Sequence, residues 1–343
     1  MGYGETKVYY DGSHYIAIPH SERPKRLRPK PVEEQITVID DKGSSAADKA
    51  AEPVIADKSD ETEKTEQVTD EHTSAPQTAV STPKQERQMT RKELFDELYD
   101  KYIDLPKRER KLKVMNGMEP YFDTVERLKI YVDNGFERKQ RNLTARRIRM
   151  VRKANLADFN YFCTFTYDDK KHTEDTFRKC LQNCFRNLCY RNAWKYMGVW
   201  ERSPEKKRLH FHGLFSIAEN AMVGELTERT DYSIVTHVMQ TILQNTFFEK
   251  KFGRNDFKPL DKRLLNESLA YLMKYIEKTG EKIVYSKGLY QYFISDIMDE
   301  DIVCRIGQED KKLLLYDDFK CWDEGLYMGR VSPEVISRMR KTN

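Results

Sequence analysis

The chain has 343 residues, a formal net charge of +4, 38% hydrophobic residues and 34% charged residues. This composition is polar for a wholly globular protein and predicts one solid core with solvated segments attached. No apolar run approaches the roughly 18–20 residues that cross a bilayer, and the first residues lack the hydrophobic region of a signal peptide. Six cysteines without a CxxC pair argue against a disulfide scaffold and indicate reduced thiols in a cytoplasm.

The first part of the chain predicts a hairpin, a basic arm and a long linker. Two β-type runs over 8–18 flank Asp11-Gly12, and the proline-rich stretch 23–31 is either a nucleic-acid contact or a solvated linker. Between Glu33 and Arg87 there are 14 Asp and Glu against 6 Lys and Arg, a net charge of −8, and no aromatic residue. Such a segment buries too little apolar surface to offset its ordering entropy, so we expect a disordered acidic linker over 32–88.

Two helices and a strongly basic run come next. Apolar residues at helical spacing predict a helix over 90–103 and another over 123–136, ended by Asn134-Gly135. The stretch 138–153 then carries eight basic residues and no acid, so it is either a solvated face or a surface that binds a polyanion in a salt-dependent way. The candidate contacts for duplex DNA are Arg138, Lys139, Arg141, Arg146, Arg147, Arg149, Arg152 and Lys153.

A compact α+β unit is expected after the basic run. We predict strands over 159–167, 194–202 and 207–217, with helices over 174–192, 231–248 and 266–280. A short turn at Ser203-Pro204 pairs the second and third strands antiparallel, so the fold class is an antiparallel sheet with helices on one face. The expected segments are 1–31 (hairpin and arm), 32–88 (linker), 89–155 (helical basic segment), 156–317 (α+β domain) and 318–343 (tail).

Two histidines lie one residue apart in the third of these strands. In RLHFHGLFSI (208–217) the odd positions are nearly all apolar, whereas His210 and His212 fall at even positions. Side chains alternate across a strand, so the two imidazoles share the face opposite the apolar residues, within reach of one cation. Glu201 ends the preceding strand, and antiparallel pairing brings it beside His210 as a third ligand. The alternative for Glu201 is a surface carboxylate at a strand end.

The helix over 266–280 has two different faces. Its apolar stripe packs on the sheet, and the pattern Y-x-x-K-Y-x-x-K places Tyr271, Lys274, Tyr275 and Lys278 on the other side. A tyrosine hydroxyl has a reference pKa near 10, so as a nucleophile it needs a nearby base, cation or polarised electrophile. The alternative is that these tyrosines border the core while the lysines remain solvated.

The three motifs CTFTYD (163–168), RLHFHGLF (208–215) and YLMKYIEK (271–278) together resemble the HUH endonuclease superfamily. Histidines placed before the tyrosines resemble the order in rolling-circle replication initiators, and the tyrosine motif is similar to that of single-stranded DNA phage initiators. The resemblance covers about 156–290. It implies an HUH endonuclease fold, ferredoxin-like, and a location in a bacterial host cytoplasm.

That resemblance also implies the chemistry. His210, His212 and Glu201 would hold Mg²⁺ or Mn²⁺, Tyr275 would attack the scissile phosphate, and Tyr271 would be a second nucleophile or a positioning group. Lys278 would steady the phosphate or the tyrosinate, and Lys274 would contact DNA. The product is a 5′-phosphotyrosine and a free 3′-OH, and a second transfer rejoins the strand. No GxxxxGK[ST] motif occurs in the sequence, so unwinding and synthesis would require a host helicase and polymerase acting on single-stranded and origin DNA.

Three other hypotheses fit parts of the same sequence. The chain could be a single-strand transposase or mobilisation nickase of the same superfamily. It could also be a non-catalytic nucleic-acid-binding regulator that stacks bases on its aromatic strands. A zinc site of Cys180, Cys184, Cys189 and His172 fits poorly, because Cys180 and Cys184 match the buried stripe of their helix.

Overall fold

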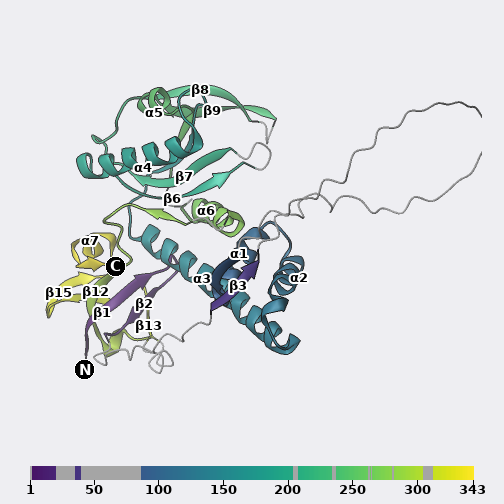
Figure 1. The fold of residues 1–343 in the computed structure, drawn as a ribbon. Coiled ribbons are helices and arrows are strands. Elements are labelled where there is room, and N and C mark those ends of the chain that lie inside the picture. The colour runs from purple at the N-terminus through teal and green to yellow at the C-terminus, as the bar shows by residue number, and fades with distance from the viewer. Residues whose placement is uncertain are drawn as a thin grey trace, which may run out of the picture.

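The computed structural model describes residues 2–20, 35–39, 86–203, 208–233, 237–261, 263, 265–279, 282–303 and 312–343. These residues form a mixed α+β architecture (Figure 1). The α-helices are α1 (Arg91–Lys101), α2 (Lys107–Met118), α3 (Val125–Asn155), α4 (Glu174–Arg191), α5 (Thr246–Lys251), α6 (Leu265–Thr279) and α7 (Pro333–Arg338). No helix among the described residues is long and apolar enough to cross a membrane.

The strands belong to two five-stranded sheets and three two-stranded pairs. The central sheet has the order β10-β5-β7-β6-β11, and the second sheet has the order β13-β2-β1-β12-β16. The strands are β1 (Gly2–Tyr10), β2 (Tyr15–Ile18), β3 (Gln35–Ile39), β4 (Glu86–Thr90), β5 (Tyr161–Thr166), β6 (Lys195–Arg202), β7 (Leu209–Ser216), β8 (Leu226–Ser233), β9 (Val238–Asn245), β10 (Asn255–Pro259), β11 (Val284–Tyr285), β12 (Tyr292–Met298), β13 (Leu313–Leu315), β14 (Lys320–Asp323), β15 (Leu326–Arg330) and β16 (Lys341–Thr342).

The central sheet confirms the predicted antiparallel α+β class, and every neighbouring pair in it is antiparallel. It differs from the prediction in one respect, because helices cover both of its faces (Figure 1). One face packs on α4 and α5 through an aromatic core that includes Phe165, Phe211 and Phe215. The other face packs on α6 and the end of α3. That second covering forms because residues such as Val199 of β6 and Leu214 of β7, on the same face as the histidines, are apolar too and have to be buried.

The second sheet joins the two ends of the described chain. The hairpin predicted around Asp11-Gly12 is confirmed, with β1 and β2 antiparallel. Its strand β1 pairs with β12, and β2 pairs with β13, so the hairpin is an integral part of this sheet. The stretch 318–343, expected as a tail, contains β14, β15, α7 and β16, and its side chains Phe319, Cys321 and Val335 are buried in the same core.

Helix α3 is one continuous helix of 31 residues, although the sequence predicted a helix end at Asn134-Gly135. Gly135 lies in the middle of α3 against the ring of Phe95 in α1. A Cβ at Gly135 would come within 2.5 Å of that ring. The prediction of a helix end was wrong because this glycine provides space for tertiary packing rather than a turn.

The stretch 231–248, predicted as a helix, contains the end of strand β8, the strand β9 and the start of α5. The two strands pair antiparallel from Leu226↔Asn245 to Ser233↔Val238. Its apolar residues happen to fall near helical spacing, but Val, Ile and Thr favour strands and the hairpin satisfies the backbone bonds locally. The helix was predicted because the spacing of the apolar residues was taken as the 3.6-residue repeat of a helix, whereas the structure has the two-residue repeat of strands.

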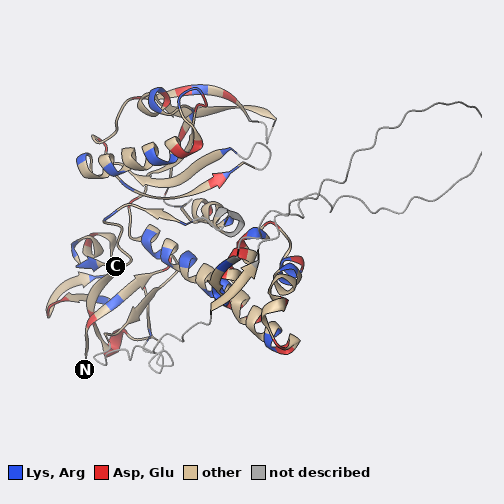
Figure 2. Cartoon of the chain, in the orientation of Figure 1, with Lys and Arg blue, Asp and Glu red and all other residues tan. Residues whose placement is uncertain are grey.

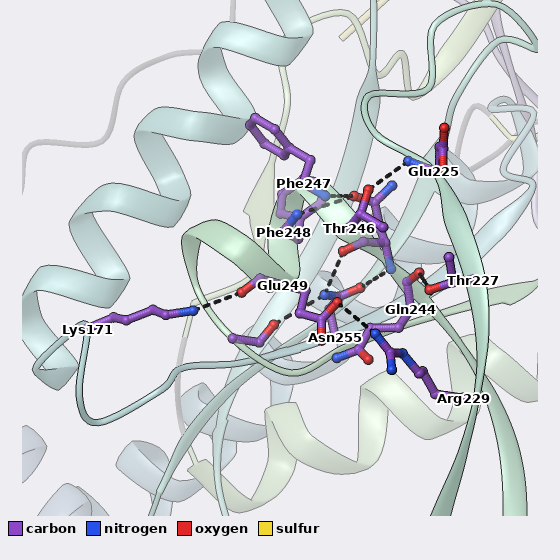
Figure 3. A network of polar contacts seen from close by, with 12 residues as sticks. Lys171, Glu225, Thr227, Arg229, Gln244, Thr246, Phe247, Phe248, Glu249 and Asn255 are labelled. Carbon is purple, nitrogen blue, oxygen red and sulfur yellow. Dashed lines mark hydrogen bonds and ion pairs between the residues drawn. The ribbon is translucent and has the colours of Figure 1, made fainter.

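A polar network fixes the end of β9 to the start of β10 (Figure 3). The buried Asn255 accepts a 2.7 Å hydrogen bond from the backbone N–H of Asn245 and donates one of 3.1 Å to the Asn245 carbonyl. The Asn245 side chain caps α5 by accepting from the backbone N–H groups of Phe247 and Phe248. This arrangement holds β10 at the edge of the central sheet.

The acidic linker is described only at its ends. There β3 and β4 form an antiparallel pair, and Val38 is buried beside Leu94 and Phe95, so the predicted disorder does not extend to these residues. The rest of the linker, 32–34 and 40–85, and the basic arm 23–31 lie outside the described residues, as do Pro204 and Gly280.

Candidate active site

The two histidines lie on β7 and each contacts a threonine of β5. His210 is opposite Thr166 and His212 is opposite Thr164 in the strand register. The threonine Oγ1 atoms are 2.7 Å from Nδ1 of His210 and 3.0 Å from Nδ1 of His212. These hydrogen bonds orient both rings through Nδ1 and leave Nε2 of each ring for other contacts. Histidines that bind a metal are typically oriented by such a hydrogen bond at their other ring nitrogen.

Glu201 joins the histidines from β6, as the hairpin geometry predicted. It pairs with His210 in the strand register, and its Oε2 atom lies 2.8 Å from Nε2 of His212. Only 7% of the His212 surface is exposed, because α6 covers this face of the sheet. Burial, followed by the electrostatic effect of the neighbouring His212, lowers the pKa of His210 to about 4. His210 is therefore neutral at pH 7, the form that offers a nitrogen lone pair to a cation.

Tyr271 reaches the same place from α6. Its ring is edge-on to the His212 ring, with centroids 5.9 Å apart, and edge-on to Phe162 at 5.7 Å. Tyr271 remains 44% exposed. It lines a cavity of about 380 Å³ together with Lys258 and Thr164, and Thr164 is the residue that contacts His212.

The remaining residues predicted on α6 are only partly described. Lys274 is exposed. The backbone of α6 continues through Tyr275 and Lys278, but the side chains of these two residues lie outside what the structure describes. Tyr275 follows Tyr271 by one helical turn, so both positions lie along one side of the helix.

Asp256 is a site residue that the sequence analysis missed. It lies on β10 directly opposite Thr164 and lines the same cavity as Tyr271. Burial raises the pKa of its carboxyl above the ordinary value. The hydrogen bond from the Leu243 N–H and the positive charges of Arg254 and Lys258 act in the opposite direction and only reduce this rise. The alternation in NDFKP (255–259), with Phe257 buried and Asp256 on the other face, is the signal that could have found it.

The donor types at this site fit a divalent cation. Two imidazole nitrogens and a carboxylate oxygen form a mixed set of the kind that Mn²⁺ accepts, while Mg²⁺ prefers more oxygen donors. Glu201 now bonds directly to His212, and within the described ranges no three His, Cys, Asp or Glu side chains are already arranged as a metal-binding group. A cation would take the place of the Glu201–His212 hydrogen bond.

Several of the predicted basic contacts on α3 have partners within the protein. Arg138 and Lys139 form ion pairs with Asp96 at 3.0 Å. The Arg152 guanidinium stacks over the Tyr9 ring at 4.0 Å, and Lys153 is buried with its ammonium on the Leu289 carbonyl. These four side chains therefore already contact other groups of the protein.

The other four of the predicted basic contacts on α3 are Arg141, Arg146, Arg147 and Arg149. Arg141 and Arg149 are exposed, and Arg146 and Arg147 are half-buried. Figure 2 shows basic residues along α3, next to the central sheet. An anion could therefore still be bound by this part of the helix.

The alternative zinc site has no support in the described structure. Cys184 is buried in the aromatic core beneath α4, whereas Cys180 is exposed. Nε2 of His172 lies 2.9 Å from the Lys251 carbonyl and donates to it.

Residues 160–280 match the model of the family described as Replication-associated protein ORF2/G2P, a family of phage rolling-circle replication initiators. The match confirms, over those residues, the resemblance drawn from the three motifs. It spans β5 to α6 and so includes Glu201, His210, His212, Asp256 and Tyr271. No curated protein and no solved structure matches the chain.

Proposed function

We propose that this protein initiates rolling-circle DNA replication by nicking and rejoining single-stranded origin DNA through a 5′-phosphotyrosine intermediate. One observation carries the proposal: Tyr271 of α6 lies edge-on to His212 in a cavity beside the histidine pair. The family match supports a role in DNA replication for the same residues.

The covalent step needs a tyrosine hydroxyl, a phosphodiester and a stabilised leaving oxygen. The tyrosine oxygen attacks phosphorus, the bond from phosphorus to the 3′ oxygen breaks, and the proton lost by the tyrosine is balanced by one gained at that oxygen. The DNA then carries a free 3′-OH that can prime synthesis. Attack by a 3′-OH on the phosphotyrosine reverses the step, so rejoining needs no nucleoside triphosphate.

Glu201, His210 and His212 would hold Mg²⁺ or Mn²⁺ in this function. When bound, the cation would polarise the scissile phosphate and stabilise the charge that develops on it. Thr164 and Thr166 keep the imidazoles oriented through their Nδ1 hydrogen bonds. Lys274 and Lys278 of α6 would supply positive charge for the DNA backbone. Tyr275 would be the attacking nucleophile, as the resemblance implies, and Tyr271 would be the second nucleophile or a group that positions the substrate.

Helix α3 would contact duplex origin DNA next to the nicking site. The contacts are expected from Arg141, Arg146 and Arg149 rather than from Arg138, Lys139, Arg152 and Lys153, which contact other parts of the protein. Unwinding and synthesis would fall to a host helicase and polymerase, in the cytoplasm of a bacterial host.

A covalent-adduct assay tests this function. Single-stranded origin DNA labelled at its 3′ end is incubated with the protein and Mn²⁺, and the denatured mixture is examined for label that migrates with protein. We expect a metal-dependent adduct that His212→Ala abolishes and that Tyr271→Phe or Tyr275→Phe reduces or abolishes.

Tyr316→Phe is the matched control, because Tyr316 is 67% exposed and belongs to a different part of the chain. It should form the adduct at the wild-type level. If the protein binds origin DNA but forms no adduct with Mg²⁺ or Mn²⁺, the nicking proposal is wrong and the protein is a non-catalytic nucleic-acid-binding regulator.

A further inference from the structure

A second cavity lies at the edge of the central sheet that ends with β11. Its volume is about 970 Å³, and its walls come from α4, β6 and the segment 284–287. β11 is the edge strand opposite β10, two strands away from the histidine strand β7, or about 10 Å at the usual strand spacing. The cavity is therefore separate from the histidine site but close to it.

The edge strand connects the two faces of the sheet at this point. Val284 packs on the α4 side and Tyr285 packs on the side of α3 and α6, where the histidines lie. A flexible chain bound along the histidine face could therefore continue around β11 into the cavity.

The chemistry of the cavity wall suits a nucleotide. Tyr190 presents a ring that is 90% exposed, an unusual state for a large aromatic side chain. Arg186 and Lys287 are exposed, form no ion pair within the described part of the chain, and line the cavity without any acidic residue. The amides of Gln182 and Asn187 add hydrogen-bond donors and acceptors of the kind that contact base edges.

Tyr285 adds a polar group that lacks a partner. Its hydroxyl oxygen is buried and makes no hydrogen bond to any described residue. Burial raises the pKa of Tyr285 to about 12, and the positive charges of Arg149 and Arg146 of α3 oppose that rise. Two further cations thus lie near the strand that borders the cavity.

We propose that this edge cavity binds single-stranded DNA away from the nick, with a base stacked on Tyr190 and the backbone phosphates held by Arg186 and Lys287. Stacking on an aromatic ring together with cations along the backbone is how proteins bind single strands without regard to sequence. The assignment of DNA as the ligand rests on the proposed function. The cavity would hold the strand in register while the tyrosine of α6 reacts.

The test compares two variants that lose the same groups at different places. Tyr190→Ala/Lys287→Ala removes a ring and a cation from the cavity. Tyr316→Ala/Lys312→Ala removes an exposed ring and an exposed lysine from the second sheet and its flank. Binding of a fluorescein-labelled oligodeoxythymidylate of about 20 nucleotides is followed by anisotropy over a range of salt concentrations.

We expect the cavity variant to bind about tenfold or more weakly and its salt slope to fall by about one, while the control binds like wild type. Equal affinity of the two variants for the oligonucleotide would overturn the proposal. The proposal would also be overturned if the wild-type protein bound free thymidine monophosphate as tightly as it binds the oligonucleotide. Thermal melting of each variant confirms folding. The adduct assay on the wild-type protein tests the proposed function separately, so failure of one leaves the other standing.

Discussion

The two faces of the central sheet are made by the same strands but carry different kinds of side chain. The face toward α4 is an almost continuous aromatic layer in which Phe165, Phe211 and Trp200 are at most 1% exposed. The face toward α6 carries the threonine-supported histidines, Glu201 and Asp256 next to a cavity. Alternation along a strand thus assigns stability to one face and chemistry to the other, so substitutions on the two faces should break different properties.

The largest expected effect is on the aromatic face. Phe211→Ala leaves a cavity among Phe165, Phe185 and Trp200, whose rings contact Phe211. We expect the free energy of unfolding to fall by about 3–5 kcal/mol, measured by urea denaturation. Tyr316→Ala, at an exposed position, should change it by less than about 0.5 kcal/mol. A loss below about 1 kcal/mol at Phe211 would show that this face is not a packed core.

The next effect concerns the space that the Phe211 ring occupies. Gly198 of β6 faces that ring, and a Cβ there would lie 2.4 Å from it and 2.5 Å from the His212 carbonyl. We expect Gly198→Ala to lower the free energy of unfolding by about 1–3 kcal/mol, because neither neighbour can move freely. Gly4→Ala is the matched control, since its Cβ would meet nothing closer than 3.7 Å. Equal stability of the two variants would contradict this packing.

The chemical face should respond in binding rather than in stability. Thr164→Val and Thr166→Val keep the side-chain shape but remove the hydroxyl from Nδ1 of each histidine. We expect the affinity for Mn²⁺, measured by electron paramagnetic resonance titration, to fall about 10–100-fold, because the imidazoles lose their orientation. The melting temperature should stay near that of wild type. A large drop in melting temperature with unchanged Mn²⁺ affinity would reverse the assignment of this face.

The smallest expected effect distinguishes two arginines of α3. Arg149→Ala removes an exposed cation and should lower the salt slope of duplex DNA binding by about one. Arg138 pairs with Asp96 of α1, so Arg138→Ala should leave that slope unchanged and cost less than about 1 kcal/mol of stability. Equal changes in slope would mean that the ion pair opens when DNA binds.

The histidine face was predictable from sequence because it depends on local rules. Alternation placed His210 and His212 on one face, and a short connection between two strands brought Glu201 beside them. The tyrosine helix followed from its apolar stripe, which buries Leu269, Leu272 and Ile276 as expected. Each of these inferences uses residues close together in the chain.

What escaped prediction depends on partners far apart in the chain. Gly135 resembled a helix end because the sequence does not reveal the Phe95 ring that fills the space beside it. The second sheet pairs β1 with β12, nearly 300 residues later, and local patterns do not specify such a pairing. Asp256 lies on a five-residue strand whose position is fixed by the Asn245–Asn255 network rather than by its own pattern.

The most direct test of the central claim identifies the amino acid that carries DNA. Trypsin cleaves after Arg263, Lys274 and Lys278, so Tyr271 and Tyr275 fall in different peptides. An adduct formed with origin DNA and Mn²⁺ is treated with nuclease and trypsin, and mass spectrometry locates the residual phosphonucleotide. The account predicts that it lies on Tyr271, Tyr275 or both. A nucleotide on a tyrosine outside α6, or an adduct that forms equally well with His212→Ala, would contradict the assignment of the α6 face as the active site.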